Sequence, residues 1–244
     1  MLKFLVMKIY SVTSDKQVNE TVEMHDYFMK KYWPLADIIV LGYKEPEYKS
    51  DFVKFDSMGE DLGIKYQMKQ IYEYFLKLDE SHFIFCSDDM PVTRPIDVEV
   101  IDYTEELLKT NKIIGRVGLT SDNVRRPHTE VSRISDEVSL IENNHDAMYK
   151  LSGTWSAWNR EYFLLYLKDS KDFWDWEVEG SKKSIQDDFR ILSFVPPPIR
   201  ISHLIKNRKF QSEWYKEAYY GTVDMFLEDQ QEVKKIFKEM AIGV

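Results

Sequence analysis

The fold is decided by one stretch of the chain, which reads His82-Phe83-Ile84-Phe85-Cys86-Ser87-Asp88-Asp89-Met90-Pro91. The aromatic and aliphatic run predicts a buried strand, and the acids and proline after it predict a turn. Ligands of open α/β sheets bind outside the carboxyl ends of the strands, so Asp88 and Asp89 lie where a metal or phosphate site is expected. The alternative is that both acids only cap the turn by hydrogen bonds to the backbone.

The composition bounds the class of protein. Its 244 residues, 43% hydrophobic and 14% aromatic, fit one large α/β domain with a buried core and exclude a disordered chain. The formal charge of −9 argues against a nucleic-acid binder. The lone cysteine, Cys86, lies in the apolar strand and is expected to be a core residue. Residues 1–10 are interrupted by lysines and predict no signal peptide, and no run is long enough for a membrane span, so we expect a soluble cytoplasmic protein.

The segments before the deciding stretch alternate between strands and helices. We expect these elements at residues 4–12 (strand), 18–33 (helix), 36–43 (strand), 52–55 (short strand) and 64–78 (helix). The second helix carries apolar residues at three- and four-residue spacing from Ile64 to Leu78, which predicts a buried face. Alternation of this kind is typical of an α/β layered fold with a mainly parallel sheet.

The same alternation continues beyond the acidic turn. We expect a helix at 101–108, a strand at 112–119 and a helix at 161–167. Residues 120–147 are polar and lack periodicity, so we expect a solvated loop there. The alternative is that Arg125-Arg126-Pro127-His128 in this segment binds a phosphate or an acceptor. No internal repeat or linker divides the chain.

A second informative stretch reads Phe173-Trp174-Asp175-Trp176-Glu177-Val178-Glu179-Gly180-Ser181. It interleaves three carboxylates with two tryptophans. Indole rings around a carboxylate desolvate its charged form, which raises its pKa toward the range of a general base. Aromatic faces also suit the apolar faces of sugar rings. The alternative is two core tryptophans with solvent-facing acids between them.

Together these pieces resemble the nucleotide-sugar glycosyltransferases of the GT-A fold and, more narrowly, small bacterial and viral glycosyltransferase-like proteins. The matching pieces are residues 83–89, 151–163 and 174–181. The resemblance implies an α/β fold, a GT-A-like three-layer α/β/α sandwich with a mainly parallel central sheet. It implies a transferase domain over residues 1–215, followed by a C-terminal helical extension at 216–244 that packs on it.

The resemblance also implies a metal site. Asp89 takes the place of the last acid of the family's Asp-x-Asp motif, which holds Mn²⁺ or Mg²⁺ on the donor diphosphate, and Asp88 would contact the sugar or ribose. Ser87 stands where a strict motif has its first acid, a departure from the family pattern. Carboxylate and phosphate oxygens suit these hard cations. His203 resembles a late histidine that serves some of these enzymes as a further metal ligand.

Further roles follow from the same resemblance. Glu177 matches the acid that deprotonates the acceptor hydroxyl, which implies an inverting single displacement, with Glu179 and Asp175 as local alternatives. Ser11 and Thr13, at the end of the first strand, would lie near the nucleotide.

The C-terminal part of the sequence adds positive charge and one more helix. Arg200, Lys206 and Lys209 belong to a basic segment that is expected to hold the donor diphosphate. Residues 223–240 carry an apolar stripe, which predicts a packing helix or a homodimer contact.

The sequence therefore predicts a glycosyltransferase that moves a sugar from a nucleotide-diphosphate-sugar donor to a saccharide or glycoconjugate hydroxyl, as in polysaccharide biosynthesis. Two alternatives stay open. A sugar-phosphate nucleotidyltransferase shares the layered fold, although no Gly-rich phosphate loop follows the first strand. A catalytically silent carbohydrate- or nucleotide-binding protein would keep the aromatic residues and tolerate the loss of Glu177.

Overall fold

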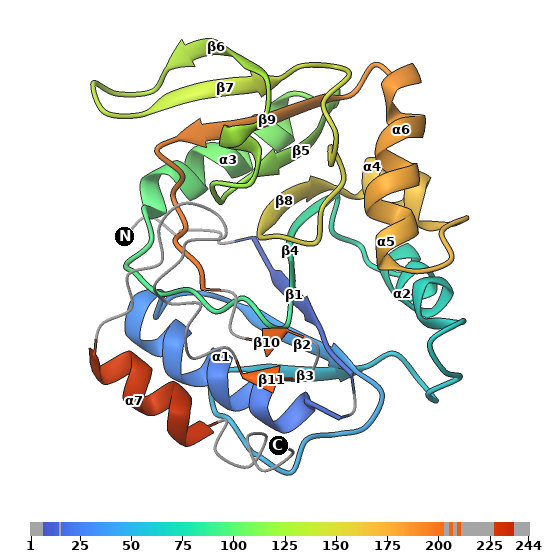
Figure 1. Ribbon diagram of the computed structural model, residues 1–244, viewed down its shortest axis with the longest axis vertical. Coiled ribbons are helices and arrows are strands. Elements are labelled where there is room, and N and C mark those ends of the chain that lie inside the picture. The colour runs from blue at the N-terminus through green and yellow to red at the C-terminus, as the bar shows by residue number, and fades with distance from the viewer. Residues whose placement is uncertain (1–6, 15, 203–204, 207–208, 211–226, 237–244) are drawn as a thin grey trace.

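The computed structural model describes residues 7–14, 16–202, 205–206, 209–210 and 227–236. Within these ranges nine strands form one sheet (Figure 1). In spatial order they are β3 (Lys54–Ser57), β2 (Ile38–Gly42), β1 (Ile9–Val12), β4 (His82–Ser87), β8 (Ser156–Asn159), β5 (Ile114–Gly118), β9 (Arg190–Val195), β7 (Ser139–Asn143) and β6 (His128–Arg133).

The sheet has a parallel half and a mixed half. Strands β3, β2, β1 and β4 pair in parallel, as their alternation with helices predicts. Strand β8 then runs antiparallel to both β4 and β5, while β5 pairs with β9 in parallel. Strands β6 and β7 form an antiparallel hairpin at the far edge. The α/β class is confirmed, but the sheet is mixed rather than mainly parallel.

The prediction of a solvated loop at residues 120–147 is wrong for most of that segment. A short 3₁₀ turn, η1 (Asn123–Arg125), is followed there by the β6–β7 hairpin. Every residue of β6 is exposed, so this strand has no buried side to produce an apolar alternation.

Helices cover both faces of the sheet (Figure 1). One face carries α1 (Val18–Tyr32), α3 (Val98–Thr110) and α7 (Leu227–Ile236). The other carries α2 (Gln67–Leu76), α4 (Arg160–Leu167) and a broken helix made of α5 (Phe173–Asp175), the π-helical turn η2 (Trp176–Gly180), α6 (Ser181–Lys183) and the 3₁₀ turn η3 (Ser184–Gln186). The result is the three-layer sandwich expected from the sequence.

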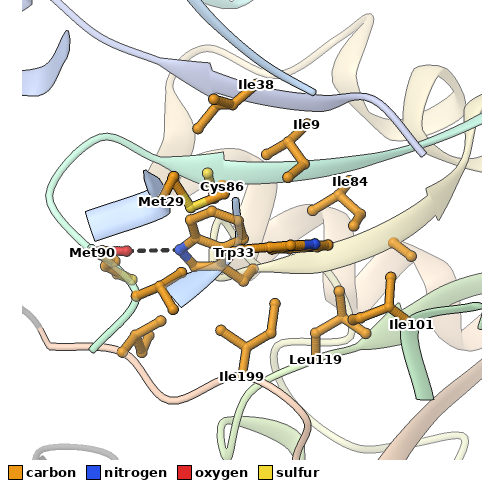
Figure 2. Close-up of a cluster of buried hydrophobic side chains, with 14 of the residues drawn as sticks. Ile9, Met29, Trp33, Ile38, Ile84, Cys86, Met90, Ile101, Leu119 and Ile199 are labelled. Carbon is orange, nitrogen blue, oxygen red and sulfur yellow. Dashed lines mark hydrogen bonds between the residues drawn. The ribbon is translucent and has the colours of Figure 1, made fainter. Parts of the chain in front are cut away.

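Two separate cores fill the spaces between the layers. In β4, Ile84 and Cys86 point into the core beneath α1 and α3, and Phe83 and Phe85 point into the other, because successive strand residues alternate in direction. Figure 2 shows the first core. In the loop before β8, Trp155 donates from its indole nitrogen to the Met90 carbonyl at 2.7 Å. This bond holds the turn after β4 against the core.

The second core is aromatic. The rings of Phe75 and Phe83 lie 4.6 Å apart between centroids, and Phe75 and Phe163 lie 4.9 Å apart. Trp176 packs 5.4 Å from Trp158, so the broken helix is anchored on the sheet just before Glu177. One expectation fails on this face: α2 begins at Gln67, and Ile64 is 71% exposed rather than part of the buried face.

The C-terminal helix α7 packs on α1. Its Asp229 is fully buried and accepts hydrogen bonds from Tyr27, Tyr32 and Lys31 of α1, and its Val233 is buried as well. This contact agrees with a packing helix, while Phe226, Phe237 and Met240 of the predicted stripe lie outside the described residues. The boundary at residue 215 and the homodimer contact stay predictions.

The part of the chain described here contains no helix of the length and apolar character that crossing a bilayer requires.

Candidate functional site

A cleft of about 540 Å³ opens at the carboxyl ends of β1 and β4. Five parts of the chain meet in it. The β1–α1 loop contributes Thr13, and the turn after β4 contributes Asp88 and Asp89. The segment after β5 contributes Asp122 and Arg126, and the segment before β8 contributes Tyr149 and Gly153. The start of the broken helix contributes Trp174 and Glu177. The position is the one that the sequence predicts for a ligand site.

The acidic pair, Asp88 and Asp89, lies on one part of the lining. The Thr13 hydroxyl donates to Oδ2 of Asp88 at 2.6 Å, and a hydroxyl contact of 3.0 Å joins Thr13 to Thr21 of α1. Burial, followed by repulsion from Asp89, raises the pKa of Asp88 above the usual aspartate range, although the bond from Thr13 opposes the shift. A cation bound here would relieve the repulsion that Asp88 feels from Asp89.

The acidic pair suits a hard divalent cation in its chemistry. Among the described residues, no three His, Cys, Asp or Glu side chains are grouped closely enough to form a metal site by themselves. A cation at Asp89 would therefore take most of its ligands from water and from substrate phosphate, which is how Mg²⁺ is commonly bound. His203 lies outside the described residues.

Glu177 lines the same cleft. Its Oε1 accepts a hydrogen bond of 2.6 Å from the Gly153 N–H. Burial raises the pKa of Glu177, while the Gly153 bond and the positive charge of Arg116 counteract part of that rise. The two local alternatives are placed elsewhere, because Glu179 is exposed and pairs with Lys182 at 2.6 Å, and Asp175 accepts from the Lys171 N–H.

The two tryptophans of the second informative stretch have different roles. Trp176 is fully buried and belongs to the aromatic core. Trp174 lines the cleft and is 65% exposed. The alternative of core tryptophans therefore holds for Trp176 alone, and a sugar contact of Trp174 stays a prediction.

Sequence reasoning missed a buried arginine behind the cleft. Arg116 of β5 is fully buried. Its guanidinium donates to carbonyls and hydroxyls of the segment before and within β8, namely the carbonyls of Tyr149 and Lys150 and the hydroxyls of Thr154 and Ser156, at 2.9–3.2 Å. It also lies 3.8 Å from the Asp122 carboxylate. Burial lowers the pKa of Arg116 to about 10, so the side chain stays charged at neutral pH.

Asp122, Arg126 and Tyr149 complete this part of the lining. Arg126 pairs with Asp122 at 3.1 Å, and its guanidinium carbon lies 4.7 Å from the centroid of the Tyr149 ring. Together with Arg116 we call these residues the arginine cluster. The only sequence signal for it was the dipeptide Arg125-Arg126 in a segment that lacks periodicity.

Two of the remaining predicted residues, Ser11 and Arg200, do not line the cleft. The Ser11 hydroxyl is fully buried 3.0 Å from Nε2 of His25, so it lies beneath the site rather than in its lining. Arg200 lies next to the Val92–Ile201 bridge, where its carbonyl accepts from the Thr93 N–H. Lys206 and Lys209 belong to a separate ribbon, β10 (Ile205–Lys206) with β11 (Lys209–Phe210), of which only the backbone is described. Their roles stay predictions.

Comparison with known proteins identifies the fold. No protein-family model matches the sequence, and no curated protein matches it. Among solved structures, GalNAc-T7 with UDP, GalNAc and Mn²⁺ aligns with 96% of this chain at a TM-score of 0.52 and 12% identity. The fold is GT-A-like. This GT-A-like chain spans 55% of the GalNAc-T7 chain, and at such identity the likeness concerns the fold alone.

Two further structures resemble the GT-A-like chain more distantly. A cytidylyltransferase from Leptospira borgpetersenii aligns over 98% of both chains, with a TM-score of 0.47 and 9% identity. An active-site mutant of LgtC aligns over 77% of this chain and 72% of its own, with a TM-score of 0.38 and 13% identity.

Proposed function

We propose that this protein is a glycosyltransferase that moves a sugar from a nucleotide-diphosphate donor to a hydroxyl of a saccharide or glycoconjugate. The observation that carries the proposal is the gathering of the acidic pair and a half-buried Glu177 in one cleft at the carboxyl end of β4. The GT-A-like fold and the neighbour that holds UDP, GalNAc and Mn²⁺ support it.

The donor would bind at the acidic pair. Asp89 would hold a Mn²⁺ or Mg²⁺ ion together with the diphosphate, and Asp88, fixed by Thr13, would contact the sugar or ribose. When bound, the cation would supply Lewis-acid stabilisation of the departing nucleoside diphosphate. Thr13 lies at the end of β1 beside this position, as a nucleotide-contacting residue should.

Glu177 would act as the general base. Its raised pKa makes the carboxylate a stronger proton acceptor, and the bond from Gly153 fixes one oxygen while the carboxylate faces the cleft. The acceptor hydroxyl transfers its proton to Glu177 as its oxygen bonds to the anomeric carbon. The bond from that carbon to the diphosphate oxygen breaks in the same step, and the configuration inverts.

A thermal-shift screen tests the donor first. UDP, GDP, CMP, dTDP and their sugar conjugates are each added with Mn²⁺, Mg²⁺ or EDTA. A ligand at ~100 times its Kd stabilises the folded state by about 2.7 kcal/mol, which a melting curve resolves. A shift for one nucleotide that EDTA abolishes is expected. A shift that survives EDTA would remove the metal from the proposal, and no shift with any nucleotide would contradict it.

Product analysis with the selected donor then separates the reaction types. Release of nucleoside diphosphate with a glycosylated acceptor is the expected result. Formation of a nucleotide sugar from nucleoside triphosphate and sugar 1-phosphate would assign a nucleotidyltransferase instead. Donor binding without any turnover would assign a silent binding protein.

A further inference from the structure

The arginine cluster gives the cleft a positive end that the proposed chemistry does not use. Asp122 lies between two guanidinium groups, Arg126 at 3.1 Å and Arg116 at 3.8 Å. One carboxylate and two guanidiniums leave a net positive charge on this group, while the acidic pair carries only acids. Arg116 is fully buried, so the accessible charge belongs to Arg126, whose side chain keeps 24% of its surface exposed.

Arg126 is held in a fixed orientation. Asp122 accepts from its Nη2 at 3.1 Å, and the Tyr149 ring lies under the guanidinium at 4.7 Å. Tyr149 is itself fixed, because its carbonyl accepts from Arg116 at 3.2 Å and its backbone has a φ of 58°. A non-glycine residue keeps such a φ only where its surroundings impose it. A planar guanidinium fixed in this way suits the paired oxygens of a carboxylate or phosphate.

An exposed indole extends the same surface. Trp174 meets Tyr149 edge to face, with ring centroids 6.2 Å apart at an interplanar angle of 72°. Trp174 belongs to the broken helix that also carries Glu177, and Glu177 bonds to Gly153 in the loop that Arg116 holds. Hydrogen bonds and ring contacts therefore connect the segments that carry these four groups, namely the Arg126 guanidinium, the Tyr149 ring, the Trp174 indole and the Glu177 carboxylate.

We propose that Arg126 is an anion-binding residue of the cleft and that Trp174 is the stacking surface for a sugar ring bound beside it. The ligand chemistry is a carboxylate or phosphate attached to a substrate. Because Trp174 and Glu177 lie on the same broken helix, we favour an acidic saccharide acceptor, such as a uronic acid or a sugar phosphate, as the source of this anion. The diphosphate of the donor is the other source of such an anion. The inference rests on the proposed function for its substrates but not for its binding test.

The test is a binding titration of the full chain that needs no turnover. Ligand-observed NMR follows glucose, glucuronic acid, glucose 6-phosphate and inorganic pyrophosphate with the wild type, Arg126→Gln, Arg126→Lys and Arg125→Gln. Arg125 is the matched control, because it carries the same charge one residue away, is exposed and does not line the cleft. In Arg126→Gln, Asp122 keeps Arg116 as a partner, so the fold is expected to persist, and a melting curve checks it.

Arg126→Gln is expected to weaken glucuronic acid and glucose 6-phosphate about 10- to 100-fold, the usual range for a lost hydrogen bond to a charged group, and to leave glucose unchanged. The affinity of Arg126→Lys for the two acidic sugars should lie between those of the wild type and Arg126→Gln. The affinity of Arg125→Gln should match that of the wild type. A loss confined to pyrophosphate would assign the anion to the donor. Equal affinity of the wild type and Arg126→Gln for all four probes, absence of binding included, would overturn the proposal.

Trp174→Ala separates the stacking surface from the charge. This variant is expected to weaken glucose and glucuronic acid to the same extent, because an aromatic face contacts the sugar ring whatever its charge. An unchanged affinity for both sugars would remove Trp174 from the site. If the titration succeeds while no nucleotide sugar binds, the anion site stands and the transferase assignment fails, so the two outcomes are distinguishable.

Discussion

The acidic pair and the arginine cluster lie at one cleft, yet the sequence predicted a site only at the first and gave Arg126 only as an alternative to a solvated loop. Asp88 and Asp89 follow directly on an apolar strand, so local periodicity marks both the strand and its end. Arg116 lies inside a strand, and Asp122, Arg126 and Tyr149 lie in segments without periodicity. The part of a site that lies at a strand end can therefore be predicted from local sequence. The part that depends on contacts between distant segments cannot.

Asp89→Asn is the most severe test of the acidic pair. The variant should abolish metal-dependent donor binding, because a neutral amide is a poor ligand for a hard cation. Thermal shifts with donor and Mn²⁺ measure the effect. Asp79→Asn is the control, since Asp79 is exposed and precedes the amino end of the same strand. Retained binding in Asp89→Asn would remove Asp89 from the proposed metal site.

Arg116→Leu tests the arginine cluster through stability. The substitution leaves buried carbonyls without donors and removes a partner of Asp122, so the free energy of unfolding should fall by about 3–5 kcal/mol. Urea denaturation measures it. Arg133→Leu on the exposed strand β6 should cost less than about 1 kcal/mol, because its ion pair with Glu130 lies in solvent. Equal losses in both variants would contradict the structural role of Arg116.

Glu177→Gln tests the chemistry that links the two regions. Donor affinity should persist while kcat falls about 100-fold or more, which corresponds to about 2.7 kcal/mol of barrier. Initial rates with the selected donor measure the loss. Glu179→Gln, two residues along and exposed, should keep wild-type rates. The reverse pattern would transfer the role of base to Glu179.

Thr13→Val asks how far the acidic pair depends on its neighbour. Loss of the 2.6 Å bond should raise the pKa of Asp88 further and weaken donor binding about tenfold, in line with a hydrogen bond to a charged group. Donor titration across pH measures both effects. Thr13→Ser keeps the hydroxyl and should restore the wild-type curve. If the donor titration of Thr13→Val matches that of the wild type at every pH, the bond from Thr13 to Asp88 does not affect donor binding.

The smallest expected effect concerns stability against pH. Burial raises the pKa of Glu177, so the folded state binds its proton more tightly than the unfolded state does. Protonated Glu177 therefore stabilises the folded state. This contribution is complete below the ordinary carboxyl pKa and is lost as the pH rises through the pKa of Glu177 in the folded state. The melting temperature of Glu177→Gln should therefore rise relative to the wild type over that interval. A constant difference at all pH values would contradict the raised pKa.

The extent of sequence prediction follows the same division along the sheet. The parallel half from β3 to β4 could be predicted, because each strand is followed or preceded by an amphipathic helix. Strand β8 could not, since Ser156-Ala157-Trp158-Asn159 is short and lies directly before α4, and its antiparallel insertion between β4 and β5 depends on long-range pairing. Strand β6 gave no signal because all of its residues are exposed.

The placement of candidate residues has a similar physical reason. Thr13, Asp88 and Asp89 meet in the cleft because they directly follow strands whose register is fixed by apolar residues, and Glu177 joins them because the buried Trp176 anchors its helical turn. Ser11 precedes Thr13 by two residues and points to the same side of β1, but it lies one pleat deeper, where His25 of α1 covers it. Proximity in sequence did not distinguish the two.

Gly153 places a limit on how the cleft can move. Its N–H donates to Glu177 at 2.6 Å, and its carbonyl accepts from the Ser87 N–H at the end of β4 at 2.9 Å. The helix that carries Glu177 and the end of β4 are hydrogen-bonded to the same residue, so we expect them to shift together. Under the proposed function, this double link through Gly153 would set the spacing between the proton acceptor and the cation-binding turn before any ligand arrives.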